Sequence, residues 1–182
     1  MPSYRYTLTV EWDKHLPRIC WVCLNPSTAD GGFRHVDPDN LGPEEDHTTK
    51  KILGFSRRWG FGSYTLVNLF PVRATDQKDL WGMSQSDRGG DSDRNVGAVN
   101  DAIAESNAVI LAWGTTMGSV ARQWVAAQMI ARVRWRTTPS EGNSIPVWCL
   151  GRTKNGQPQH PARVGYATER YNWFGDITTP VR

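Results

Sequence analysis

Asparagine and histidine residues that could act on a nucleobase stand beside apolar segments at several places in the chain. Asn25 begins a polar turn, Asn68 lies at the end of an apolar run, and His160 precedes Pro161 in a loop. An asparagine amide presents two donors and one acceptor in a plane, so Asn68 could pair with a pyrimidine edge and Asn25 could hold a water molecule. A histidine near a leaving oxygen can donate a hydrogen bond, which suits His160. N-glycosidic cleavage needs an oriented water and stabilised charge on the departing base.

Carboxylates and aromatic rings could complete such a site. Asp30 or Asp46 could act as a base or steady an oxocarbenium ion, while Phe70 could stack on the base and Phe33 could cover it. Ordinary alternatives stay open, because the two aspartates can be helix caps worth ~1 kcal/mol and asparagines at strand ends often make turns. The prediction therefore depends on these residues meeting at one place in the fold.

Four apolar runs predict the strands that position these residues: 18–24, 64–69, 108–113 and 146–150. Runs of this length without polar alternation are typical of parallel strands that are buried on both faces. Polar motifs follow each run directly, and ligands of open α/β sheets bind outside the carboxyl ends of the strands. We therefore expect the candidate residues to converge at that edge.

Helical periodicity separates the apolar runs. Residues 48–59 predict a helix capped by Asp46, and further helices are expected around residues 96–103 and 120–130. Alternation over residues 4–10 predicts one more strand, whereas 29–45 and 71–90 are expected to be mostly loop. Alternating strands and helices predict a single domain, residues 1–182, with a three-layer α/β/α fold around a mostly parallel, four-stranded sheet.

Composition excludes several classes of protein. The 182 residues contain no apolar run of about 18 residues, so no membrane span is expected, and the first residues lack a signal-peptide core. We expect a cytoplasmic protein. Cys20, Cys23 and Cys149 are too few for a disulfide framework, and no second ligand pair at usable spacing follows the first two. We therefore expect no metal and no cofactor.

Basic residues are concentrated in the last part of the chain. Residues 113–182 carry nine basic and three acidic side chains, whereas residues 1–112 carry twelve basic and fifteen acidic ones. This skew fits contacts with a phosphate backbone, although a merely solvated surface is an equal alternative. The candidate phosphate or DNA contacts are Ser27, Thr28, Arg73, Thr115, Arg122, Arg152, Lys154 and Arg163.

Five segments together resemble an uncharacterised domain family found in bacteria and phages: residues 24–30 (LNPSTAD), 46–60, 67–75, 112–114 (AWG) and 150–161. This pattern is in turn similar to the uracil-DNA glycosylase superfamily. Asn25-Pro26 resembles a motif whose asparagine positions the attacking water, and Asn68 resembles the strand-end asparagine that reads the base edge. Residues 111–114 resemble the L-W-G that follows the third strand, and His160-Pro161 resembles the motif whose histidine stabilises the leaving base.

The resemblance implies a uracil-DNA glycosylase-like fold and an enzyme that hydrolyses the N-glycosidic bond of a modified or damaged pyrimidine in DNA, for repair or DNA modification, after flipping the base into a pocket. Ala162 and Arg163 follow His160-Pro161 where the superfamily has serine, and no glycine precedes Asn25. Two alternatives share the fold: a transferase or hydrolase of phage DNA base hypermodification, and a non-catalytic nucleobase-binding or nucleic-acid-binding protein. The expected partner is DNA, single-stranded or modified, bound by a monomer in the cytoplasm, which for a phage protein is that of the host.

Overall fold

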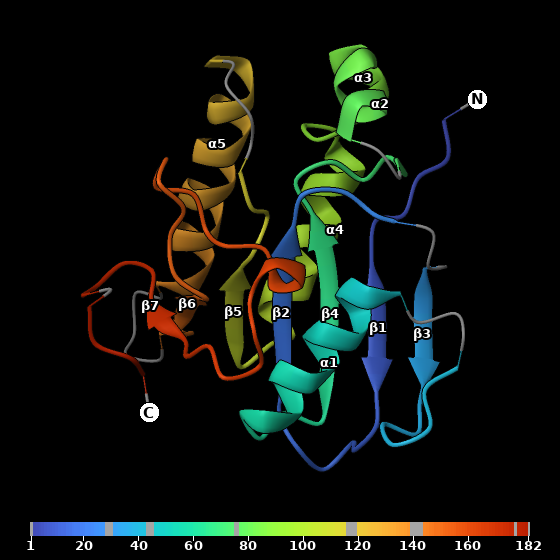
Figure 1. Ribbon diagram of the computed structural model, residues 1–182. Coiled ribbons are helices and arrows are strands. Elements are labelled where there is room, and N and C mark those ends of the chain that lie inside the picture. Colours follow the sequence, from blue (N-terminus) through green and yellow to red (C-terminus); the bar gives the residue numbers. More distant parts are fainter. Residues whose placement is uncertain are drawn as a thin grey trace.

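The central feature of the fold is a seven-stranded mixed sheet with helices on both faces (Figure 1). The computed structural model describes residues 2–27, 31–42, 46–74, 77–115, 120–138, 144–176 and 178–181. The strand order is β3-β1-β4-β2-β5-β6-β7. In chain order the strands are β1 (Leu8–Glu11), β2 (Arg18–Cys23), β3 (Gly32–His35), β4 (Ser63–Asn68), β5 (Ala108–Leu111), β6 (Val147–Cys149) and β7 (Tyr171–Asn172). The helices are α1 (His47–Arg58), α2 (Gln77–Gly82), α3 (Gln85–Arg88), α4 (Asp93–Ala104), α5 (Val120–Thr137) and the 3-10 helix η1 (Pro161–Arg163).

The four predicted core strands are adjacent and parallel, as expected from their apolar runs. β4, β2, β5 and β6 pair in parallel, and every residue of β4 and β5 is buried. The carboxyl ends of these strands therefore meet at one edge of the sheet. This arrangement confirms the α/β class and the parallel core.

The prediction of a four-stranded sheet was wrong, because three further strands extend it. β1 joins antiparallel to β4, β3 pairs with β1 inside a segment that we expected to be loop, and β7 adds antiparallel to β6. β3 is only four residues long and β7 only two. Strands this short carry no readable alternation, and their formation depends on pairing with distant segments.

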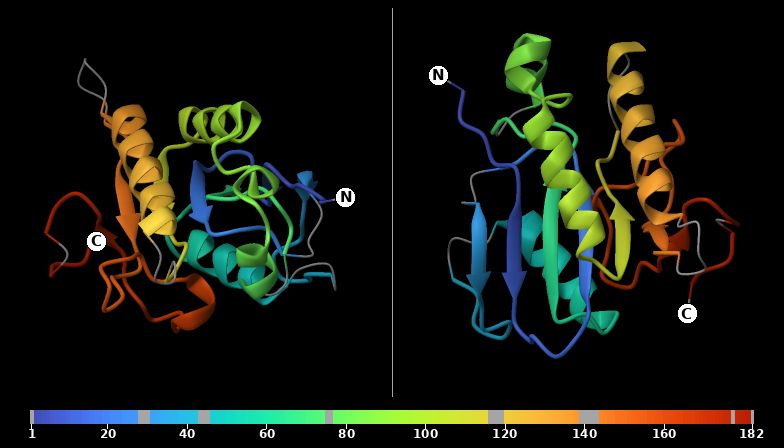
Figure 2. Two further views of the ribbon diagram at one scale, coloured as in Figure 1. Left: turned by 90° about the horizontal axis from the view of Figure 1, so that it is seen from above. Right: turned by 180° about the vertical axis from the view of Figure 1, so that it is seen from behind.

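Two apolar layers hold the helices against the sheet (Figure 2). α1 packs on one face, with Ile52 and Phe55 against Trp21. α4 and α5 pack on the opposite face, where Val99 and Val133 belong to a separate cluster of buried apolar residues. Cys20 and Cys23 face opposite layers, as their three-residue spacing on a strand predicts.

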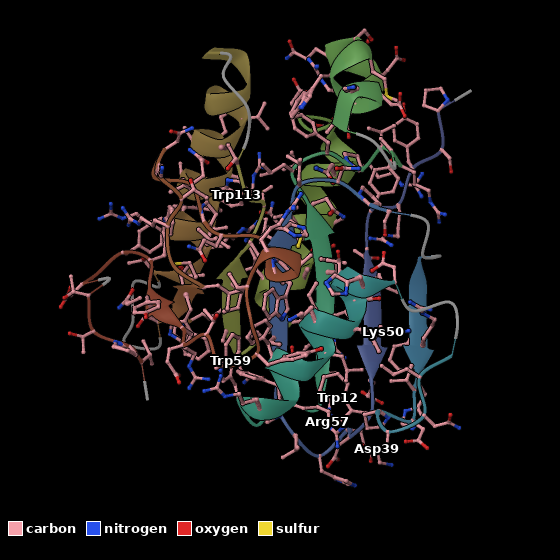
Figure 3. The ribbon with its side chains drawn as sticks, in the orientation of Figure 1. Trp12, Asp39, Lys50, Arg57, Trp59 and Trp113 are labelled. Carbon is pink, nitrogen blue, oxygen red and sulfur yellow. The ribbon has the colours of Figure 1, made fainter. Side chains whose placement is uncertain are left out.

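Most tryptophans serve this core. Trp21 and Trp113 are at most 1% exposed, and Trp59 stacks on Trp21 at 5.9 Å between ring centroids. Trp59 and Trp113 are labelled in Figure 3. The three cysteines are buried and unbridged, and burial raises the pKa of Cys23 to about 12. Such thiols are poor nucleophiles at neutral pH. Within the described ranges, no helix is both long and apolar enough to cross a membrane.

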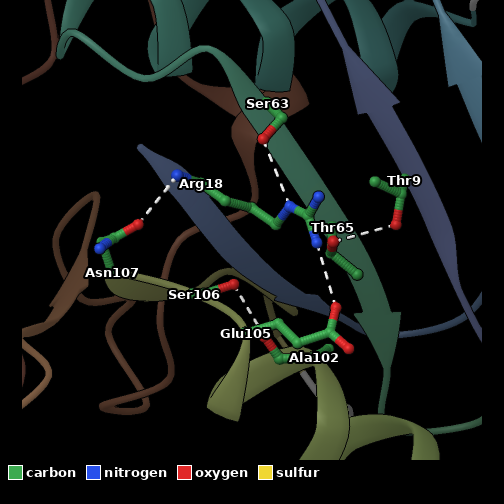
Figure 4. A network of polar contacts seen from close by, with 8 residues as sticks. All are labelled: Thr9, Arg18, Ser63, Thr65, Ala102, Glu105, Ser106 and Asn107. Carbon is green, nitrogen blue, oxygen red and sulfur yellow. Dashed lines mark hydrogen bonds and ion pairs between the residues drawn. The ribbon is translucent and has the colours of Figure 1, made fainter. Parts of the chain in front are cut away.

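Polar side chains join the amino ends of the central strands (Figure 4). Arg18 of β2 donates to the Ser63 hydroxyl at 3.3 Å and pairs with Glu105 at 3.1 Å. Thr9 and Thr65 share a hydrogen bond of 3.0 Å between β1 and β4. These contacts join α4 and β1 to the central strands. The Arg18 contacts lie at the edge of the sheet opposite the predicted site.

Candidate functional site

A cavity of about 850 Å³ lies at the carboxyl ends of β2 and β5. Five segments far apart in sequence form its wall: the turn after β2, the start of α1, the segment after β4, the residues after β5, and the loop from β6 into η1. Among the predicted residues the wall includes Asn25, Ser27, Thr115, His160 and Arg163. The predicted convergence at this edge is confirmed for these five.

Asn25 reaches the cavity with one end of its amide already engaged. Its Nδ2 donates to the Ala74 carbonyl at 2.6 Å and to the Pro26 carbonyl at 3.0 Å. The backbone N–H of Ala74 returns a bond to Pro26 at 3.3 Å, so the turn is fastened to the segment after β4. Within the described residues nothing donates to Oδ1. That oxygen can accept one hydrogen of a water molecule and fix its orientation.

His160 caps η1, and this contact decides which of its nitrogens carries the proton. The backbone N–H of Ala162 donates to Nδ1 at 3.3 Å, so Nδ1 acts as an acceptor. Burial lowers the pKa of His160 to about 4, with the nearby charge of Arg163 acting in the same direction and that of Asp46 opposing it. The imidazole is therefore neutral at pH 7, with Nε2–H as a hydrogen-bond donor.

Gly114 packs closely against His160, and the lack of a side chain at position 114 leaves room for the histidine. Its φ is +74°, and a Cβ at this position would lie 3.1 Å from the His160 Cβ. The Gly114 N–H also donates to the Pro158 carbonyl at 2.9 Å, which joins the turn after β5 to the loop before η1. A side chain at position 114 would be strained and would press on the histidine.

Asp46 holds the cavity together rather than lining it. Its Oδ1 caps α1 by accepting the Thr49 N–H at 2.8 Å, and its Oδ2 accepts the Ser27 hydroxyl. Burial alone would raise the pKa of Asp46, but the bonds from Ser27 and Thr49 outweigh burial and lower it. Both oxygens of Asp46 accept hydrogen bonds and Asp46 is not among the described wall residues, so the structure shows a capping and positioning contact, and its predicted role as a catalytic base stays a prediction. Asp30 lies outside the described residues.

Asn68 is near the cavity in the fold but not on its wall. Asn68 is the last residue of β4 and is 1% exposed. It pairs with Cys23 of β2, which precedes Asn25 by two positions. Both Nδ2 and Oδ1 are buried without a hydrogen-bond partner in the described part of the chain. A buried amide left unpaired costs about 1–3 kcal/mol, so a structural role alone does not account for it.

Neither Phe70 nor Phe33, the two predicted aromatic contacts, lies on the described cavity wall. Phe70 is 4% exposed and meets Trp81 edge-on at 5.5 Å between centroids, so its ring is part of the core. Phe33 is 60% exposed on β3, an edge strand three positions from β2 in the sheet. Trp113 is the aromatic residue among those that line the described cavity, but it is only 1% exposed, and its Nε1 donates to Gln157 at 2.7 Å. It is the last residue of the apolar run 108–113.

Other residues were also missed. His47 and Thr48, at the start of α1, and Gln159 line the cavity. The predicted Asp46 cap was the signal for the first two, because residues just inside a helix lie beside its cap. Gln159 is on the wall because the loop after β6 turns back across β5, which no local pattern indicates.

The basic candidates do not gather around the cavity as a group. Arg163 lies at its rim, but Arg152 donates to the Trp173 carbonyl at 2.9 Å and stacks on that ring, and Lys154 is exposed away from the wall. Arg73 lines a second hollow of about 880 Å³ beside α4, whose wall has none of the motif asparagines or histidines. Thr28 and the Arg122 side chain lie outside the described residues.

The low pKa of His160 predicts how stability depends on pH. In the unfolded chain this imidazole takes up its proton near pH 6.5, whereas in the fold it does so only near pH 4. Acid between these values therefore favours the unfolded state, and stability falls by roughly 3 kcal/mol at most as pH drops from 6.5 towards 4. Urea unfolding at several pH values checks this.

His160→Gln should flatten that part of the stability curve. The lowered pKa of Asp46 acts in a separate window, below its usual value of 3.8, because that carboxylate must be protonated before its bonds are lost. A wild-type curve already flat between pH 6.5 and 4.5 would contradict the burial of a neutral His160.

The fold and the cavity together define an α/β protein with a cavity lined by polar residues at the carboxyl ends of its parallel core strands. The chain belongs to the family described as Protein of unknown function (DUF1643), whose model matches residues 5–162. The matched region contains every described residue of the cavity wall except Arg163. No curated protein and no solved structure matches the chain.

Proposed function

We propose that this protein is a DNA glycosylase-like enzyme that receives a modified or damaged pyrimidine base in its cavity and hydrolyses the N-glycosidic bond. One observation carries the proposal: Asn25 and His160, from opposite ends of the chain, line the same cavity. Each has the polar atom that the reaction needs. Asn25 offers an acceptor for water, and neutral His160 offers a donor for the departing base.

The proposed reaction uses these two groups in sequence. A water molecule whose hydrogen is bound by Asn25 Oδ1 attacks C1′ of the sugar. The electron pair of the N-glycosidic bond leaves with the base, and the water gives up its second proton to solvent. Negative charge develops on the base carbonyl oxygen, where His160 Nε2–H donates a hydrogen bond. A neutral donor that is already in position stabilises this charge through a hydrogen bond, and His160 keeps its own proton.

The remaining wall residues suit a nucleotide that has left the helix. Ser27 and Thr115 offer hydroxyl groups, and Arg163 at the rim offers a charge for a phosphate. Asn68 supports the proposal as an unpaired amide beside the site, which a base edge could satisfy once the wall opens towards it. A flipped or single-stranded base meets these requirements.

A non-catalytic reader is the second candidate, and a specific observation favours it. In the described part of the cavity wall there is no carboxylate, so no Asp or Glu side chain can act there as general base towards the proposed water. A protein that binds an extruded base without cleaving it would need the same donors and acceptors. The two candidates differ only in whether a base is released.

Oligonucleotides bearing a range of pyrimidines test the proposal. Uracil, mismatched thymine, 5-substituted and oxidised pyrimidines, each in single-stranded and duplex form, are incubated with the protein and then treated with alkali. We expect scission at one or more of these bases, together with free base in the supernatant. Tight binding without scission on all substrates would establish the reader, and neither binding nor scission would remove DNA as the partner.

A further inference from the structure

An exposed aromatic and basic surface lies far from the cavity, at the carboxyl end of α5. Trp135 is 71% exposed and Phe174, on the loop after β7, is 41% exposed. The guanidinium of Arg136 lies 4.7 Å from the Trp135 ring, and that of Arg134 lies 5.5 Å from the Phe174 ring. We call these four residues the α5 patch.

The charge of α5 is one-sided. Its eighteen residues include four arginines and no acidic residue. Neither Arg134 nor Arg136 forms an ion pair with any residue that the structure describes. The nearest carboxylate along the chain from Phe174 is Asp176, whose oxygens accept bonds from Thr178 and Thr179. The charges of the patch are therefore available to an anionic partner.

The core does not account for the exposed ring. α5 packs on the sheet through Ala126, Met129, Val133 and Thr137, and Trp135 lies on the other side of the helix. An exposed tryptophan with arginines on either side offers a flat face and fixed positive charge. These are the two elements with which proteins hold single-stranded nucleic acid, through base stacking and backbone attraction.

We infer that the α5 patch is a second nucleic-acid contact, which stacks on an unpaired base and binds its flanking phosphates. The choice of a nucleic acid over other polyanions rests on the proposed function, but no cleavage step is needed. α5 runs antiparallel to β5, so its end lies at the opposite edge of the sheet from the cavity (Figures 1 and 2). Arg134, Trp135 and Arg136 follow the first residue of α5 by 14 to 16 positions, so at 1.5 Å rise they lie about 21–24 Å along the helix from its start. One strand could contact both sites only by running along this side of the molecule.

Binding of fluorescent (dT)30, followed by anisotropy at several salt concentrations, tests the inference. Trp135→Ala should raise the Kd about tenfold, because one stacked base contributes about 1–3 kcal/mol, and Trp135→Phe should recover much of the loss. Arg134→Ser/Arg136→Ser should lower the slope of log Kd against log salt by about 1.4, at about 0.7 for each phosphate contact. The charge-matched control is Lys14→Ser/Lys50→Ser, which removes two exposed lysines on other elements and should change neither value.

The outcomes separate this inference from the proposed function. His160→Gln should lose base release while it keeps (dT)30 binding, whereas the patch variants should do the reverse at saturating substrate. Patch variants that bind (dT)30 like the control would overturn the inference, whatever the base-release assay shows. So would loss of binding only to vesicles containing phosphatidylserine, which would assign the patch to an anionic membrane surface.

Discussion

Replacing His160 with alanine is expected to lower the single-turnover rate of base release by roughly 10²–10³, with little change in DNA binding. The Nε2–H bond strengthens as charge develops on the departing base, so its loss affects the transition state more than the bound ground state. Rapid-quench measurements with enzyme in excess check the rate, and anisotropy checks binding. His15→Ala, an exposed histidine on the turn between β1 and β2, is the matched control.

The pH profile gives this prediction a second readout. Because burial lowers the pKa of His160 to about 4, its donor state does not change between pH 5.5 and 8. The wild-type rate should therefore show no inflection near pH 6.5 that belongs to His160. An inflection of that kind would be present in the wild type and absent from His160→Ala. Such an inflection, or a rate loss equal to that of the His15 control, would mean that His160 does not donate to the leaving group.

Replacing Asn68 with leucine is expected to stabilise the fold by about 1–3 kcal/mol and to remove selectivity between bases. Both polar atoms of this side chain are buried without a partner, so an apolar group of similar size relieves a desolvation penalty. Retaining such a residue is typical of a functional site, where stability is sacrificed for recognition. Urea unfolding measures the first effect, and competition between oligonucleotides with different pyrimidines measures the second.

Asn95 provides a control of the same residue type and burial. It is 0% exposed, and its Nδ2 lies within hydrogen-bond distance of three backbone carbonyls, those of Asn68, Leu69 and Gly90, at 3.2–3.4 Å. Asn95→Leu should therefore destabilise the fold by about 1–3 kcal/mol, because these carbonyls lose their donor. If Asn68→Leu destabilises the protein to the same degree, the Asn68 amide is structural and the base-reading role is wrong.

Features that depend on neighbouring residues could be predicted from the sequence. The apolar run of β2 required a strand with both faces covered, and the polar turn after it placed Asn25 at the carboxyl edge. The capping signal at Asp46 located the start of α1 to within one residue. His160 reached the same edge because the loop that contains it follows β6, the next parallel strand beyond β5.

The exposure and partners of a side chain could not be predicted where they depend on distant segments of the chain. Phe70 and Phe33 are the same residue type, yet Phe70 packs edge-on against Trp81 and Phe33 is exposed on an edge strand. Asp46 could be a cap or a base from sequence alone. The tertiary structure shows that it is a cap, and that Ser27, nineteen residues earlier, donates to its second oxygen.

By itself the sequence determined the α/β class, the four parallel core strands and the edge where Asn25 and His160 meet, because hydrophobic burial imposes a period that neighbouring residues reveal. The tertiary structure alone decided that β1 joins the sheet beside β4, that β3 and β7 form, that His160 is neutral, that the Asn68 amide is unpaired among the described residues and that the α5 patch is separate from the cavity. Each of these depends on which groups from distant segments surround a side chain, and that environment fixes its burial, its partners and its charge.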